Sequence, residues 1–266
     1  MSMLVAERAL QDRRRGFVGW SLGIAAYVAL IASVYPSVQN SGVQRALHDY
    51  PKELKAFFGG SRAFDLSTGA GYLNVELFSL VIPALLAIVA IGFAASTLAG
   101  EEEAGQMDLL LAYPVTRSRV VLEKIATLGG MLLALAMVVT VSIVAIGARA
   151  DLGVSAGRVA TASFGAALAA LFVGLATMFT GAATGRRAVA IGVGTALFAV
   201  SYLLVGLAGL VSWIEPLRVL SPLYHATGTQ PIRNGIPFGN YAVLVALCSA
   251  TAVAVVVVFD RHDLTR

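Results

Sequence analysis

The sequence predicts an all-α membrane protein with six transmembrane helices. Its composition is the first reason, because 58% of the 266 residues are hydrophobic and only 13% are charged. A soluble domain with a mean hydropathy of +0.82 would expose more apolar surface than water tolerates. The second reason is a series of six apolar runs, each long enough to cross the roughly 30 Å hydrocarbon core of a bilayer. We therefore expect residues 1–266 to form one transmembrane domain.

The N-terminal segment, residues 1–15, is too polar to cross a membrane. Apolar and charged residues alternate in it with helical spacing, and it ends in Arg13-Arg14-Arg15. This pattern predicts a helix that lies at the membrane interface. The first span follows at residues 17–35. A secretory signal peptide is a weaker interpretation, because the apolar run is long for the hydrophobic core of a signal peptide and the rest of the chain remains apolar.

The second and third spans flank the most charged segment of the chain. A mixed loop at residues 37–71 leads to the second span, at residues 73–99, which Pro83 should kink. The charged segment covers residues 100–124, and the third span is expected at residues 125–148.

The second half of the chain predicts three further spans, at residues 159–183, 188–213 and 241–259. Between the last two, residues 215–240 contain four prolines, which predicts a loop with at most a short interfacial helix at residues 217–227. Glycine pairs such as Gly181 and Gly185, or Gly192 and Gly194, allow close helix packing.

Basic residues predict the orientation of the six spans, which place both termini on one side of the membrane. The side of the termini holds 11 Lys and Arg residues and the other side holds 8. The positive-inside rule then predicts cytoplasmic termini in a bacterial plasma membrane.

The charged segment contains its own helical pattern. It starts with Glu101, Glu102 and Glu103, and the apolar residues that follow fall at i, i+3 and i+4 on one helical face: Met107, Leu110 and Leu111. Pro114 should end this short helix, and Thr116 can cap the next one, which begins near Arg117. A short helix on one face of the membrane favours contact with a soluble partner.

The sequence lacks the residues that ion-coupled transport and nucleotide binding require. None of the six apolar runs has an ionisable side chain near its centre, and Glu76 lies at the outer end of the second run, so ion-coupled transport is disfavoured. The sequence has no Gly-rich phosphate loop, so energy for transport would come from another subunit. The net charge of +4 is ordinary for a membrane protein and does not indicate nucleic-acid binding.

Enzymatic interpretations are also weak. The three histidines, His48, His225 and His262, lie in predicted loops or at the end of the chain, and no zinc-protease motif is present. We expect His225 to be solvated, with an outer-face site formed with Tyr224 as the weaker alternative. The single cysteine, Cys248, is expected to pack as a small hydrophobic residue.

The stretch from Ala99 to Arg117, followed by Lys124, resembles the cytoplasmic segment between the second and third spans of ABC type-2 permeases. That family has an acidic start, a Leu-rich helix and Pro-Val-Ser/Thr-Arg at this place; Gln106-Met107 departs from its usual Gly-Thr. Tyr50-Pro51, Phe58-Gly59-Gly60, Gly71-Tyr72-Leu73 and the tail from Phe259 to Leu264 are similar to the branch that exports antibiotics and related compounds.

The resemblance implies a permease subunit that exports a lipophilic or amphipathic substrate and has no cofactor or metal of its own. ATP and Mg would bind to separate ABC ATPase subunits, two copies of which would pair with two permeases, the second being a copy of this chain or a paralogue. Residues 105–113 would form the coupling helix that enters a groove of the ATPase. The residues expected to couple to the ATPase are Glu101, Glu102, Glu103, Gly105, Met107, Leu109, Leu110, Leu111, Pro114 and Arg117. The alternative is a membrane anchor or assembly factor that docks a soluble protein without transporting anything.

Overall fold

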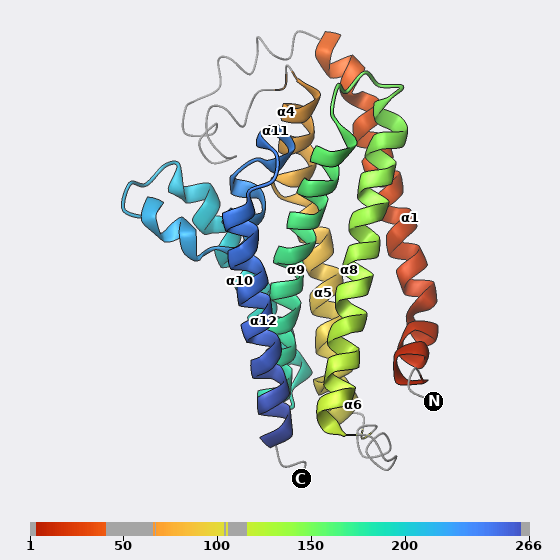
Figure 1. The fold of residues 1–266 in the computed structure, drawn as a ribbon, viewed down its shortest axis with the longest axis vertical. Coiled ribbons are helices and arrows are strands. Elements are labelled where there is room, and N and C mark those ends of the chain that lie inside the picture. Colours follow the sequence, from red (N-terminus) through yellow and green to blue (C-terminus); the bar gives the residue numbers. More distant parts are fainter. Residues whose placement is uncertain (1–3, 41–65, 67, 104, 106–115, 262–266) are drawn as a thin grey trace.

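A computed structural model describes residues 4–40, 66, 68–103, 105 and 116–261, with side chains from Arg15 to Asp260. Within these residues the chain is helical and has no β-strand. Figure 1 shows long helices packed side by side. In chain order the helices are α1 (Leu4–Asn40), α4 (Gly69–Leu73), η1 (Asn74–Phe78), α5 (Val81–Thr97), α6 (Ala99–Glu103), α8 (Arg117–Gly147), α9 (Ala156–Thr184), α10 (Arg187–Ala208), η2 (Glu215–Leu220), η3 (Tyr224–Gly228), α11 (Pro231–Asn234) and α12 (Phe238–Arg261).

Among the described residues, six stretches are long and apolar enough to cross a membrane, which confirms the predicted fold class. They are Arg15–Gln39, Gly69–Glu103, Arg117–Gly147, Ala156–Thr184, Arg187–Ala208 and Phe238–Asp260. Each contains or overlaps one predicted apolar run. The fifth is shorter than expected, because α10 ends at Ala208 and the chain then turns through Gly209 and Leu210.

The two inner helices are α5 and α9; α8, α10 and α12 pack around them, and α1 packs mainly on α8. α9 contacts α5, α8, α10 and α12, and its small residues allow this close approach. At Gly194 of α10, an added Cβ would lie only 2.2 Å from Oγ1 of Thr177 on α9. Gly192, by contrast, faces open space, so the predicted pair of packing glycines contributes one contact rather than two. The buried Cys248 packs as expected, with its thiol 3.7 Å from the Leu168 carbonyl oxygen.

The second span is interrupted near Pro83, as the sequence predicts. It consists of α4, the single π-helical turn η1, a turn at Ser79 and Leu80, and then α5. Pro83 lies in the first turn of α5, where its missing N–H costs least. The interruption therefore falls before the proline, as a break between two helices rather than as a bend within one.

The first helix differs in shape from the expected interfacial segment plus span. α1 continues from Leu4 through Pro36 to Asn40 without a break in the helix. The interfacial position of residues 1–15 stays a prediction, because the side chains before Arg15 lie outside the described part of the chain.

The segment between α10 and α12 is more ordered than predicted, and the expectation of a solvated His225 is wrong. Residues 215–234 fold into η2, η3 and α11. His225 lies in η3 and is only 5% exposed. Its Nε2 atom is 2.8 Å from the Val219 carbonyl oxygen, and its Nδ1 atom is 3.4 Å from Oδ1 of Asn240. These two polar groups and the neighbouring helices replace the water that we expected around the ring.

Candidate functional site at the α6 end of the bundle

The predicted coupling residues begin at α6, at the end of the bundle where α1 starts and α12 ends (Figure 1). A hydrogen bond of 2.6 Å from Ser118 Oγ to Asp260 Oδ2 joins the start of α8 to the end of α12. The α4 and α11 elements lie at the opposite end (Figure 1). The start of the charged segment and the end of the last span therefore share one end of the bundle.

We use the name α6 corner for Glu101, Glu102 and Glu103 together with the three groups near their carboxylates: Lys124, Gly185 and the backbone N–H of Arg187. α6 follows α5 directly and is held to it by a 3.0 Å hydrogen bond from the Glu102 N–H to the Leu98 carbonyl. It also packs against α9 and α10. Each of its three glutamates points to a different helix.

Glu101 forms an ion pair with Lys124 of α8. The Lys124 side chain is only 3% exposed, and its Nζ atom also donates to the Thr97 carbonyl at the end of α5. A buried ammonium group is stable only when its charge and its N–H donors are satisfied. Lys124 therefore connects the end of the second span to the start of the third.

Glu102 lies beside the turn between α9 and α10. Gly185 ends α9 with a left-handed φ of 62°, a conformation that favours glycine. A Cβ at Gly185 would lie 3.0 Å from Oε1 of Glu102. The absence of a side chain at position 185 thus allows the Glu102 carboxylate to lie against this turn.

Glu103 binds the start of α10. Its Oε1 atom accepts a 2.9 Å hydrogen bond from the backbone N–H of Arg187. Arg186, at the N-cap position, makes no side-chain cap, so Glu103 supplies an acceptor from a distant part of the chain. A carboxylate at this place also interacts favourably with the partial positive charge of a helix N-terminus.

The remaining predicted coupling residues are partly outside the described structure. Gly105 is exposed, with a φ of 65°, and its N–H donates a 3.0 Å hydrogen bond to the Glu102 carbonyl at the end of α6. Arg117 is half-buried in the first turn of α8. Thr116 occupies the expected N-cap position, although its side chain makes no capping hydrogen bond. The other predicted residues, Met107, Leu109, Leu110, Leu111 and Pro114, lie outside the described residues.

Sequence reasoning missed Lys124 as part of this site, because it counted as one more basic residue before an apolar run. A signal was present in the spacing. Val121, Lys124 and Leu128 fall on one buried helical face of α8. A lysine within such a stripe requires a carboxylate from another element.

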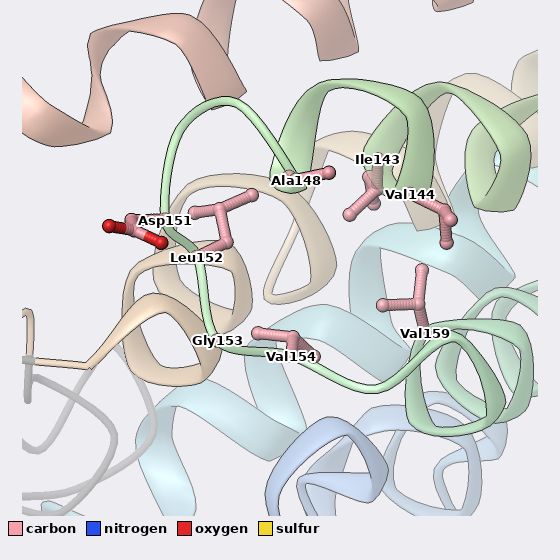
Figure 2. Close-up of a pocket in the computed structure, with 9 residues that line it drawn as sticks. Ile143, Val144, Ala148, Asp151, Leu152, Gly153, Val154 and Val159 are labelled. Atoms are coloured by element: carbon pink, nitrogen blue, oxygen red, sulfur yellow. The ribbon is translucent and has the colours of Figure 1, made fainter.

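A cavity lies where α8 turns into α9. Its volume is about 320 Å³, and it is lined by residues that include Val144, Leu152 and Val159. Figure 2 shows Asp151 pointing away from the valines. Apart from Asp151, the side chains that line the cavity are apolar, and we assign it no chemistry.

The fold and the α6 corner define the class of protein: a multi-pass helical membrane protein with a polar cluster at one end of its second span. Residues 3–264 match the family described as ABC-2 family transporter protein. This match covers nearly the whole chain, and the protein belongs to the ABC-2 transporter family. No curated protein matches the sequence at a significant level.

Proposed function

We propose that this chain is the permease subunit of an ABC exporter in a bacterial plasma membrane, with both termini in the cytoplasm. A separate ABC ATPase subunit would bind ATP and Mg and supply the energy. The family match over residues 3–264 is the observation that carries this proposal. Two permeases and two ATPases would form the complex and move a lipophilic or amphipathic substrate outward.

The α6 corner suggests how movement of the ATPase would reach the spans. The segment after Gly105, with Leu109, Leu110 and Leu111, would contact the ATPase, and Pro114 and Arg117 would set its return to the membrane. A force on this segment would reach α6, whose carboxylates lie against α8, α9 and α10. Spans three, four and five would then move together, as rigid-body transport mechanisms require.

This arrangement changes the role that we propose for the three glutamates. Glu101 and Glu103 bind groups within the chain, so we assign them to force transmission. Direct contact with the ATPase would then fall to Met107 and the leucines. Contacting and transmitting residues differ in their mutational effects, because only the first group changes ATPase binding.

The first experiment is affinity purification of the tagged chain from detergent-solubilised native membranes, with identification of co-purifying subunits and an ATPase assay. We expect a subunit with ATP-hydrolysing activity, and we expect Leu110→Asp to lose it. Leu220→Asp is the matched control, because Leu220 is 74% exposed on η2, far along the chain from α6. Retention of the ATPase by Leu110→Asp would contradict the contact role.

The second experiment separates transmission from binding in the reconstituted complex. Lys124→Met should leave the ATPase bound while substrate export per ATP hydrolysed falls severalfold. Arg119→Met is the control, because among the described residues Arg119 forms only an exposed pair with Glu123 on the same helix. If the chain purifies with a partner that hydrolyses no ATP, the anchor or assembly-factor function replaces the exporter.

A further inference from the structure

The seam between α1 and the beginning of the second span contains a polar cluster that the proposed coupling mechanism does not use. The Tyr72 hydroxyl donates a 2.9 Å hydrogen bond to the Ile31 carbonyl of α1. The Tyr72 ring also lies 5.2 Å from the Tyr35 ring, at an angle of 46°. These two contacts define which residues of the two antiparallel elements face one another.

One helical turn further along this seam, the residue spacing places Glu76 opposite Tyr27. Glu76 follows Tyr72 by four residues and Tyr27 precedes Ile31 by four, and the two elements run in opposite directions (Figure 1). Tyr27 and Glu76 are both half-buried, so the cluster is open at the side of the bundle.

No cation of the described residues forms an ion pair with the Glu76 carboxylate. In the described residues, no hydrogen bond or ion pair to Glu76 is formed. The sequence also has no Lys, Arg or His at residues 16–40, and none at 69–98. A carboxylate in a membrane-spanning segment is costly, and such residues commonly mark a ligand or ion site.

The local backbone is also unusual. Glu76 lies in η1, a π-helical turn closed by a 2.8 Å hydrogen bond from the Ser79 N–H to the Asn74 carbonyl. Such turns are rare and occur often at functional sites. Asn74, only 5% exposed, adds an amide to this turn.

We propose that the seam between α1 and η1 binds the ammonium group of an amphipathic molecule, with Glu76 as the counter-ion and Tyr27 as a neighbouring aromatic wall. A carboxylate attracts an ammonium group by charge, and an aromatic face adds a cation–π interaction. The apolar tail would extend over α1, where Leu30 is 62% and Val34 41% exposed. These two side chains share the helical face of Tyr27.

The test measures binding to the full chain in lipid nanodiscs and needs no ATPase. Trp213→Phe leaves Trp20 as the single tryptophan, on α1 about two helical turns from Tyr27. The probe is an undecylamine that carries a dansyl group at its far end, and energy transfer from Trp20 reports its binding. The matching dansyl undecanoate is the control probe, because it differs only in the sign of its head group.

We expect Glu76→Gln to raise the Kd of the ammonium probe about tenfold, which is typical for the loss of one charged contact. Tyr27→Phe preserves the ring and should raise the Kd less than threefold, whereas Tyr27→Ala should raise it more. Glu215→Gln, which changes an exposed carboxylate on η2, should bind the probe as the parent does. Parent-like affinity in Glu76→Gln, or equal binding of the undecanoate, would overturn the proposal.

A lipid comparison distinguishes two sources of the ammonium group. If the occupant is a lipid head group, phosphatidylethanolamine in phosphatidylglycerol nanodiscs will raise the Kd of the probe for the parent chain and not for Glu76→Gln. If the occupant is a soluble cationic amphipath, both nanodiscs will give the same Kd. Either result supports the site, and neither depends on whether the chain works as an exporter.

Discussion

The glutamates at the two ends of the second span differ in whether they have a charged partner. At one end, Glu101 binds a buried lysine of another span, and that lysine also binds a backbone carbonyl. Near the other end, Glu76 has no cation among the described residues and is half-exposed beside Tyr27. The comparison indicates that a carboxylate with an internal partner connects helices, whereas one without a partner is available to a ligand. Substitutions at the two ends should therefore affect stability very differently.

The largest expected loss of stability follows substitution of Lys124. Lys124→Met leaves Glu101 and the Thr97 carbonyl without their donor, and should lower the free energy of unfolding by about 2–3 kcal/mol. Unfolding in mixed detergent, followed by circular dichroism, measures this change. Arg119→Met is the surface control and should change it by less than about 0.5 kcal/mol. Equal effects of the two substitutions would show that the buried pair does not hold the α6 corner together.

The second-largest loss of stability is expected at the turn between α9 and α10, where Gly185 lies beside Glu102. Gly185→Ala places a Cβ at a φ of 62° and 3.0 Å from the Glu102 carboxylate, and should cost about 1–2 kcal/mol. Gly192→Ala is the matched control, because a Cβ there meets no atom within 4 Å; it should be neutral or slightly stabilising. Thermal melts of the two variants in the same detergent measure this difference in stability, and equal melting temperatures would contradict it.

A smaller effect is expected at Glu103. Glu103→Gln preserves an acceptor for the Arg187 N–H but removes the charge at the start of α10, so it should cost about 0.5 kcal/mol. Glu103→Ala removes the acceptor as well and should cost about 1 kcal/mol. Hydrogen exchange of the first turn of α10 measures both. No difference in exchange between parent and Glu103→Ala would contradict the capping role.

The smallest effect is expected at Glu76. Glu76→Gln removes a charge without breaking an ion pair of the described structure, and should change the free energy of unfolding by less than about 0.5 kcal/mol. The same unfolding assay applies, in a lipid mixture without amines. A loss as large as that of Lys124→Met would make Glu76 a structural residue and remove the contrast between the two ends of the span.

Much of the fold was predictable because hydropathy is a local property of the sequence. Each apolar run became helical, and Pro83 correctly marked the interrupted span. The segment at 215–240 was harder to predict. Its prolines suggested a loop, but short helical turns still form there because they pack on α9, α10 and α12.

The candidate site was predictable only in part. The run of glutamates and the resemblance of residues 99–117 to ABC type-2 permeases predicted a coupling site in this region of the chain. They did not indicate that Glu101 meets Lys124, or that Glu103 meets the start of α10, 84 residues further along the chain. The apolar residues from Met107 to Leu111 stay a prediction of the sequence.

The sequence by itself determined the class of protein and the number of spans, because a bilayer accepts only long apolar segments with internal hydrogen bonds. The tertiary structure decided what each charge does. Glu76 and Glu101 are chemically identical, and only the packing of α1 and α8 around the second span gives Glu101 a partner and leaves Glu76 without one among the described residues. The reason is that charge pairing depends on distances of a few ångströms between helices, and these distances are not encoded in any single stretch of the chain.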